Sequence, residues 1–384
     1  MSAEATLSST DRPPLARTPL FDLHMAAGAR MVGFAGYEMP VQYEHGVLHE
    51  HNHTRTQAGL FDVSHMGQAR LSPITGDGDG DAASLMEKLV PGGISTLGEG
   101  RIRYTLLTHA DGGIRDDLMV TRFGETVWLV VNAACKTQDF AHIAEALGGQ
   151  ANLDVQDRAL LALQGPQAAH VLARHIEAVD ELAFMQAIWA AWRGHEVLVS
   201  RCGYTGEDGF EISLPPEIAE EFAKTLLGDE EVALIGLGAR DSLRLEAGLC
   251  LYGHDIDLTT SPVEADLLWT IPKRRRESAD YPGADIVATH LASGAPRARV
   301  GLLPDGRAPA REGTEICAPD GTPIGTVTSG GFSPTLGRPV AMGYVAADFA
   351  APDTPVHLMV RGRALPARVS EMPFVPHKYV RAGK

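Results

Sequence analysis

Alternating hydrophobic and polar positions in the middle of the chain predict a β-hairpin. Residues 195–200 carry an apolar run at 197–199, a glycine-rich stretch follows, and apolar and polar residues alternate over 210–214. Three glycines within seven residues predict a tight connection between the two strands. Glu211 stands between Phe210 and Ile212, so its carboxylate is expected on the opposite face of the strand, which is either solvated or lines a polar cavity.

Hydrophobic patterning and turn residues predict strands and helices along the rest of the chain. Residues 101–131 read as three short strands with glycine turns, followed by a helix over about 135–147. Residues 160–227 repeat this order with a strand, a helix, the hairpin and a second helix. This order predicts two antiparallel sheets with helices on one face, which is an α+β architecture. From about residue 297, short strands alternate with glycine, proline and aspartate turns, which predicts a separate β-barrel-like domain.

Composition and charge narrow the class of protein. The chain has 384 residues, which is enough for two or three domains. Its 49 acidic residues outnumber the 33 Lys and Arg, and a formal net charge of −16 argues against a nucleic-acid partner or an anionic membrane surface. The basic run Lys273–Arg276 is either a local anion site or a solvated charge run.

The cysteines and the N-terminal segment bear on the compartment. The four cysteines are widely spaced, without C-x-x-C pairs, and are expected to be reduced thiols. Residues 1–17 have no apolar core for a secretory signal, and no later run is long enough to cross a bilayer. A cytoplasmic setting is expected. The mitochondrial matrix is disfavoured because this leader is poor in Arg.

Two local patterns are reminiscent of metal sites. His49 to His53 match H-E-x-x-H, but the neighbouring positions are polar and no third ligand stands at a familiar spacing, so a solvated helix face is expected. Residues 77–81 resemble the start of a calcium loop, yet Ala82 and Lys88 replace the turn glycine and the bidentate glutamate. We therefore expect no bound metal. The sequence contains no dinucleotide-binding fingerprint, so we also expect neither a flavin nor a nicotinamide cofactor.

Two acidic residues open an apolar strand after a Gly-Gly turn. Strand alternation sends Asp116 and Asp117 to opposite faces, so at most one of them enters a cavity. The residues alone do not choose between them. The alternative is that both are surface residues flanking the turn.

Arg240 is expected at the head of a helix, with Gly238 just ahead of it. A helix N-terminal region beside an arginine suits a carboxylate or an electron-rich heterocycle. The alternative is a structural ion pair with Asp241 or Glu246.

Six segments together resemble the aminomethyltransferase (T-protein) family of the glycine cleavage system. In chain order they are Asp62–Met66, Gly112–Leu118, Gly203–Ile212, Gly238–Leu249, Thr328–Pro334 and Pro373–Pro376. No single segment would carry the resemblance. Their shared order over roughly residues 18 to 380 argues against chance.

The resemblance implies a fold, with two ferredoxin-like sheet-and-helix domains interleaved in sequence around a central folate cavity. The expected boundaries are 18–66 with 153–257 for the first domain and 67–152 with 258–290 for the second. A C-terminal β-barrel or jelly-roll-like domain is expected over 291–384, and residues 1–17 form a flexible leader.

The resemblance also implies an activity. The enzyme would transfer the methylene carbon of an aminomethyl-lipoyl carrier, the H protein, to tetrahydrofolate, releasing ammonia and 5,10-methylenetetrahydrofolate. Asp117 would be the catalytic carboxylate, because folate-linked dimethylglycine and sarcosine enzymes match only the second aspartate. Substrate and folate contacts would come from Met66, Tyr104, Asn132, Tyr204, Glu211, Arg240, Trp269 and Tyr379.

Two other functions occur among similar proteins. A folate-binding component of dimethylglycine or sarcosine oxidation would need a flavin from a separate protein, and an absorbance scan would detect it. A non-enzymatic folate-binding protein of iron–sulfur maintenance would carry a cysteine where this chain has Thr205.

Overall fold

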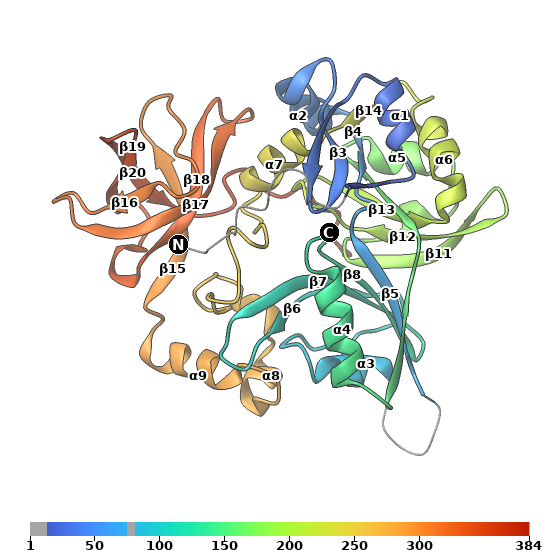
Figure 1. The fold of residues 1–384 in the computed structure, drawn as a ribbon, viewed down its shortest axis with the longest axis horizontal. Helices are drawn as coiled ribbons and strands as arrows, with labels where there is room; N and C mark the ends of the chain where they lie inside the picture. Colours follow the sequence, from blue (N-terminus) through green and yellow to red (C-terminus); the bar gives the residue numbers. More distant parts are fainter. Residues whose placement is uncertain (1–13, 75–80, 384) are drawn as a thin grey trace.

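A computed structural model describes residues 14–74 and 81–383. Residues 1–13 of the expected leader and residues 77–80 of the acidic loop lie outside the described residues. Three lobes are visible in Figure 1: two sheet-and-helix lobes and a barrel. In the described part of the chain, no helix combines the length and the hydropathy that a membrane span requires.

The first lobe is built on a six-stranded sheet. Its strands, in spatial order, are β11 (Gln186–Trp192), β12 (His195–Arg201), β13 (Gly209–Leu214), β10 (Ala159–Gln164), β4 (Ala58–Asp62) and β14 (Val232–Ile235). Only the β14–β4 pair is parallel. A small sheet precedes it, formed by β1 (Ala16–Arg17), β3 (Tyr37–Gln42) and β2 (Arg30–Phe34), with helix α1 (Phe21–Ala26).

Helices cover both faces of the six-stranded sheet. Helices α5 (Ala168–Leu172) and α6 (Ala219–Leu226) pack on the face that carries Leu161 and Phe210. Helix α7 (Leu237–Glu246) packs on the opposite face, against Leu160, beside α2 (Gly46–Thr56). The expectation of helices on one face is therefore wrong for this sheet, because both faces of β10 are apolar and each requires a cover.

The second lobe is a five-stranded antiparallel sheet with helices on one face. Its spatial order is β6 (Ile102–Thr108), β7 (Ile114–Phe123), β8 (Thr126–Val131), β5 (Gly67–Pro73) and β9 (Ala151–Val155). Helices α3 (Ala82–Glu87) and α4 (Lys136–Ala146) cover the face that carries Leu118 and Val120. The other face meets the first lobe, where Trp128 packs against Leu198.

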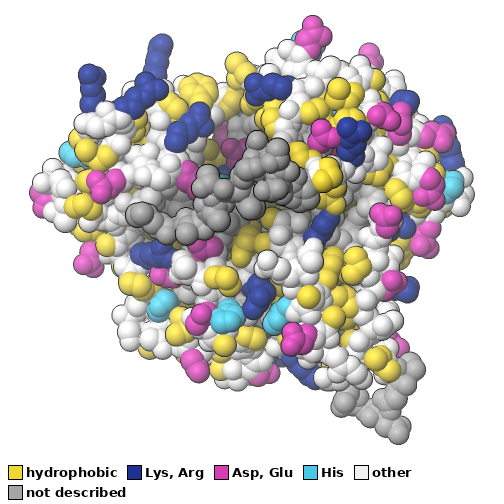
Figure 2. Space-filling view, in the orientation of Figure 1, with side chains coloured by type: hydrophobic (Ala, Val, Ile, Leu, Met, Phe, Trp, Pro, Cys, Tyr) yellow, Lys and Arg dark blue, Asp and Glu magenta, His cyan; other side chains and the backbone are white. Residues whose placement is uncertain are grey.

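The C-terminal lobe is a closed barrel, as the turn-rich sequence predicts. Its strands follow the order β15 (Arg297–Pro304), β18 (Arg338–Ala346), β17 (Pro323–Ser333), β16 (Glu315–Cys317), β19 (Pro355–Val360) and β20 (Arg363–Ser370). Helices α8 (Lys273–Ser278) and α9 (Ala284–Ser293) precede it. On the face drawn in Figure 2, acidic and basic side chains are dispersed among hydrophobic ones, and several basic side chains lie over the barrel at the upper left.

A buried ion-pair cluster fastens the barrel to the first lobe. Glu246 of α7 accepts hydrogen bonds from Arg55 at 2.7 Å, from Ser333 at 2.5 Å and from the Thr335 hydroxyl at 2.7 Å. His51 approaches the same carboxylate at 3.2 Å. Because Ser333 ends β17 of the barrel and Arg55 lies on α2, one carboxylate joins three elements that are far apart in sequence.

Candidate active site

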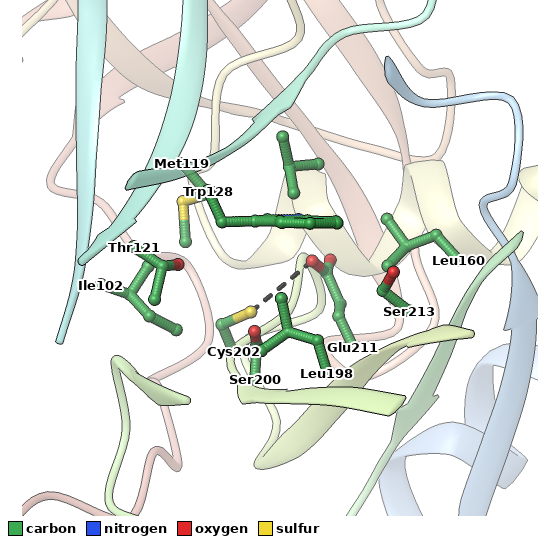
Figure 3. Close-up of a pocket in the computed structure, with 11 residues that line it drawn as sticks. Ile102, Met119, Thr121, Trp128, Leu160, Leu198, Ser200, Cys202, Glu211 and Ser213 are labelled. Carbon is green, nitrogen blue, oxygen red and sulfur yellow. Dashed lines mark hydrogen bonds between the residues drawn. The ribbon is translucent and has the colours of Figure 1, made fainter. Parts of the chain in front are cut away.

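A pocket lies between the two sheets, and Glu211 points into it (Figure 3). Its neighbours on β13, Phe210 and Ile212, are fully buried in the core on the other face, as strand alternation predicts. The pocket is lined by Ile102, Met119, Thr121, Trp128, Val130, Leu160, Leu198, Ser200, Cys202, Glu211 and Ser213. The connection between β12 and β13 spans residues 202–208, so it is a loop and not the tight turn that the glycines predict.

The Glu211 carboxylate is held in a largely apolar setting. Its Oε2 accepts a hydrogen bond from the Cys202 thiol at 3.6 Å. Burial raises the pKa of Glu211, and the nearby positive charge of Arg240 opposes that rise. A carboxylate with so few donors of its own is ready to accept hydrogen bonds from a ligand.

Arg240 is the matching cation. Its Nη1 is buried and has no hydrogen-bond partner among the described residues, and its guanidinium lies 4.7 Å from the centroid of the Tyr204 ring. Neither of the alternative ion pairs forms, because Asp241 binds Arg244 and Glu246 binds Arg55. A buried guanidinium with a free N–H is a second group directed at a ligand.

The position of Arg240 differs from the expectation. Helix α7 begins at Leu237, so Arg240 lies one turn inside the helix, and Gly238 is also helical. The N-terminal dipole argument is therefore wrong. At Gly238 a Cβ would come within 2.6 Å of Val47, so glycine allows α7 to approach α2 closely.

Asp117 lies on the face of β7 that also carries Met119 of the pocket lining. Its carboxylate accepts hydrogen bonds from the Tyr104 hydroxyl at 2.9 Å and from Asn132 Nδ2 at 2.8 Å. Burial, followed by the charge of Asp116, raises the pKa of Asp117 to about 7. A carboxyl group that titrates near neutrality can act in proton transfer at physiological pH.

Asp116 faces the other way, toward α4. Its side chain is fully buried, so the alternative of two turn-flanking surface residues is wrong. Asn132 donates to Asp116 through its backbone N–H at 3.0 Å and through Nδ2 at 2.9 Å. One asparagine thus contacts both aspartates.

The aromatic residues named by the resemblance gather around these groups. Tyr104 stacks on Trp269 with ring centroids 5.5 Å apart and an 18° angle between planes, while 67% of Trp269 stays exposed. The Tyr204 hydroxyl donates to the Cys250 carbonyl. Met66 packs against the apolar cluster that contains Leu160, and Leu160 lines the pocket.

Tyr379 reaches the same region from the C-terminal segment. Its ring stacks on Phe184 with centroids 3.9 Å apart. Burial raises the pKa of Tyr379 to about 12, and Arg381 and Cys202 are among the charged and polar groups that act on it. Cys202, Phe184 and Trp128 were not predicted; Cys202 directly precedes the Gly203–Ile212 motif, and only that adjacency could have indicated it.

The two histidines of H-E-x-x-H have different surroundings. His49 is exposed, as expected, but His53 is half-buried and its Nε2 lies 3.0 Å from the Glu231 carbonyl. The solvated-face prediction is therefore wrong for His53. Glu50 is buried and accepts hydrogen bonds from the backbone N–H groups of Tyr43 and Gly236, so it is occupied by structure.

The basic run at residues 273–276 is, as a whole, neither a local anion site nor a solvated charge run. Arg275 is buried and donates to the carbonyls of Glu87 and Val90. Arg274 pairs with the Glu87 carboxylate at 2.8 Å. Two of its four cations therefore anchor α8 to the second lobe.

Three side chains come close enough together to hold a metal ion in the described part of the chain. One ligand atom each from Asp116, Cys135 and Asp139 lies within 4.8 Å of the others. Asp116 already accepts two hydrogen bonds from Asn132, and we interpret this group as a proton-sharing cluster.

A buried carboxylate, an arginine whose Nη1 has no partner among the described residues and nearby aromatic rings are the kinds of group that line small-molecule sites in enzymes. Residues 20–275 match the GCVT N-terminal domain, and residues 297–376 match the glycine cleavage T-protein C-terminal barrel domain. The chain belongs to the glycine cleavage T-protein family, the aminomethyltransferases.

Relatives and a solved structure agree along almost the whole chain. The chain is 48% identical to the mitochondrial aminomethyltransferase of Gallus gallus over 96% of this chain and 94% of the relative. It is 46% identical to the mitochondrial aminomethyltransferase of Homo sapiens over 95% of this chain and 91% of the relative. The crystal structure of the glycine cleavage system aminomethyltransferase T from Bartonella henselae superposes with a TM-score of 0.90 at 43% identity, covering 96% of this chain and all of that one.

Proposed function

We propose that this aminomethyltransferase takes an aminomethyl group from the lipoyl arm of an H-type carrier protein and delivers its carbon to tetrahydrofolate. The carbon loses its bonds to sulfur and to nitrogen and gains bonds to N5 and N10 of the folate. The two protons of N5 and N10 leave with the dihydrolipoyl thiol and with ammonia, so the exchange needs no oxidant. The observation that supports this most is the buried Glu211 carboxylate with Arg240 near it, together with Tyr204, on which the charges of both Arg240 and Asp117 act.

We assign recognition of the pterin edge to Glu211. A reduced pterin presents an N3–H and a 2-amino group side by side, and a carboxylate accepts both. Glu211 has only a weak thiol donor of its own, so a ligand can satisfy it. The Arg240 Nη1 would bind an electronegative atom of the substrate.

We assign the chemistry to Asp117. Its carboxylate would stabilise the cationic iminium character that develops as the carbon leaves sulfur or nitrogen, and would accept the N10 proton during ring closure. Tyr104 and Asn132 orient it through both oxygens. Holding the two reactants together in one pocket supplies the rest of the rate acceleration.

We assign the flat faces of the folate to the surrounding apolar and aromatic side chains. These are Met66, Tyr104, Tyr204, Trp269 and Tyr379. Trp269, two-thirds exposed and stacked on Tyr104, suits the outer part of such a ligand.

The remaining proposals concern cofactors, partners and compartment. We propose that the enzyme uses no metal, flavin or nicotinamide and binds neither nucleic acid nor membrane, in keeping with the net charge of −16. All four cysteines are free thiols, which suits a reducing compartment. We propose the cytoplasm, with the mitochondrial matrix as the alternative that the names of the eukaryotic relatives favour.

An ammonia-release assay tests the proposal. Purified enzyme is mixed with an aminomethylated lipoyl carrier, with and without tetrahydrofolate. We expect release that depends on tetrahydrofolate. Equal release in its absence, or release that requires an added electron acceptor, would contradict the proposal.

A further inference from the structure

A chain of polar groups runs from Asp117 through Asn132, directly after β8, and Asp116 to Asp139 on helix α4. Asn132 Nδ2 lies 2.8 Å from an Asp117 oxygen and 2.9 Å from an Asp116 oxygen, and its backbone N–H binds the second Asp116 oxygen at 3.0 Å. The carboxylate that we assign to catalysis therefore shares its hydrogen-bond donor with a second, fully buried carboxyl group.

A third carboxyl group completes the chain. Asp139 on α4 is fully buried, and neither of its oxygens has a hydrogen-bond donor among the described residues in its ionised form. One carboxylate oxygen of Asp116 lies within 4.8 Å of one of Asp139. An O–H on Asp116 is the donor that would satisfy the Asp139 carboxylate, and two adjacent buried carboxylates cannot both be ionised without a large electrostatic penalty.

We propose that Asp116 and Asp139 share one proton, and that this pair is a positioning element that fixes Asn132 and sets the pH at which Asp117 becomes ionised. The inference rests on the role proposed above for Asp117. Asp116 and Asp139 contact neither folate nor carrier in this account, and they act only through Asn132 and through their charge.

The surrounding groups determine which member of the pair holds the proton. Burial and the charge of Asp139 raise the pKa of Asp116 to about 8, whereas burial raises that of Asp139 only to about 6, because Arg115 and the contact with Asp116 stabilise its charge. At neutral pH the proton resides mainly on Asp116.

The tyrosines and thiols that face these carboxyl groups are neutral at that pH. Tyr104 of β6 and Tyr204 of the 202–208 loop face Asp117, and Tyr252 faces Asp116. Cys135, at the N-cap of α4, and Cys250 also act on these carboxyl groups, and burial raises the pKa of both thiols. Arg115 is therefore the cation that acts on the pair.

The two members have different effects on Asp117, which gives the proposal its test. In Asp139→Asn, Asp116 loses its carboxylate neighbour and ionises, so negative charge moves next to Asp117 and its pKa rises. In Asp116→Asn, the charge stays on the more distant Asp139, as in the wild-type enzyme, so the pKa of Asp117 changes little. A role in packing alone would lower activity in both variants without moving the pH profile of Asp139→Asn alone.

The experiment is the pH dependence of kcat/KM for tetrahydrofolate-dependent ammonia release, with thermal unfolding as a check on folding. The acidic limb should move up by about one pH unit in Asp139→Asn and stay close to the wild-type position in Asp116→Asn. Glu145→Gln removes an exposed carboxylate from the same helix and should leave the limb unchanged. An unchanged limb in Asp139→Asn, or an equal shift in both aspartate variants, overturns the proposal.

A second measurement needs no variant and no activity. Infrared difference spectra of the wild-type enzyme between about pH 5 and about pH 9 should show a protonated carboxyl band that persists at neutral pH and disappears at the alkaline end. Absence of that band at neutral pH overturns the shared proton even if catalysis is as proposed. Stoichiometric metal that is lost in both Asn variants would also overturn it, because a metal ion would then occupy the cluster.

Discussion

Among individual side chains, Asp117 carries the largest expected effect on turnover. Asp117→Asn keeps the shape of the side chain and removes its charge, so turnover should fall by about 10² or more while folding and folate binding are largely kept. Steady-state kinetics of ammonia release measures this. Asp116→Asn, assayed at its own pH optimum, should lose much less, because Asp116 faces α4. Equal losses, or a larger loss at Asp116, would mean that the reacting groups lie on the other face of β7.

Glu211 should matter for binding more than for chemistry. Glu211→Gln replaces an acceptor of two hydrogen bonds with a group that pairs poorly with a donor edge, so tetrahydrofolate binding should weaken by about 1 to 3 kcal/mol. Titration calorimetry measures the change, and Glu196→Gln, on the exposed end of β12, serves as the control. Unchanged affinity for folate in Glu211→Gln would remove Glu211 from the pterin site.

Local patterns predicted the orientation of single residues well where the neighbouring residues determined it. The face of Glu211 follows from Phe210 and Ile212, whose burial any strand register must satisfy. Asp139 could not be predicted, because its importance arises from contact with β7 and β8 and not from its neighbours on α4. The same is true of Phe184, which meets Tyr379 from the far end of the chain.

At the level of helices, α2 offers a direct test of the H-E-x-x-H pattern. His53 is bound to a backbone carbonyl and Glu50 to two backbone N–H groups, so neither side chain is free to form a zinc site. Purified enzyme should contain far less than one zinc per chain by elemental analysis, and a chelator should leave activity unchanged. Stoichiometric zinc, with activity lost on chelation and restored by metal, would replace the mechanism proposed here.

The Glu246 cluster should dominate the attachment of the barrel to α2 and α7. Hydrogen bonds from His51, Ser333 and Thr335 outweigh burial and lower the pKa of Glu246 to about 2. Glu246→Gln leaves Arg55 in a buried site with less compensation, so the free energy of unfolding should fall by about 3 kcal/mol. Chemical denaturation measures it, and Glu220→Gln, which breaks an exposed pair with Lys224, should change stability by less than about 0.5 kcal/mol. A similar loss in both variants would show that the buried cluster contributes no more to stability than an exposed ion pair does.

The same cluster gives a pH dependence with a definite sign. The folded pKa of Glu246 lies below its ordinary value of 4.5, so its contribution to stability is complete above about pH 4.5 and is lost as the pH falls toward about 2. Glu246→Gln should show less acid-induced loss of stability over that window than the wild-type enzyme. An identical acid profile in both proteins would contradict this assignment.

Helix boundaries were predicted less well than strand alternation. The start of α7 was placed too late because Gly238 was interpreted as a residue preceding the helix, whereas it is a point of close contact with Val47. The basic run in α8 was expected to be one unit, yet Arg275 is buried and Lys273 is exposed. Both errors arise because tertiary contacts, and not local propensity, decide these positions.

For the whole molecule, the order of strands is the feature that the residues alone could not give. The six-stranded sheet takes β4 from before the five-stranded sheet and its other strands from after it, so the first lobe needs distant parts of the chain, whereas the strands of the second are consecutive. The α+β class, the repeat and the barrel were predictable from periodicity and turns. The interleaving followed from family resemblance, and the domain boundaries stated for it stay a prediction. Met66 packs against the cluster of Leu160, and Tyr379 lies near enough to Cys202 for it to affect the pKa of Tyr379, so residues from both ends of the chain come close to the pocket lining.

The account makes one central claim, that the carbon of the aminomethyl group ends between N5 and N10 of tetrahydrofolate. The most direct measurement starts from a lipoyl carrier whose aminomethyl carbon is labelled with ¹³C and follows the label by NMR after adding the enzyme and tetrahydrofolate. The label should appear in 5,10-methylenetetrahydrofolate in equal amount to the ammonia released, and at a rate lowered by about 10² or more in Asp117→Asn. Release of ammonia while the label stays on the carrier would contradict the claim. So would appearance of the label as free formaldehyde at the same rate with and without the enzyme.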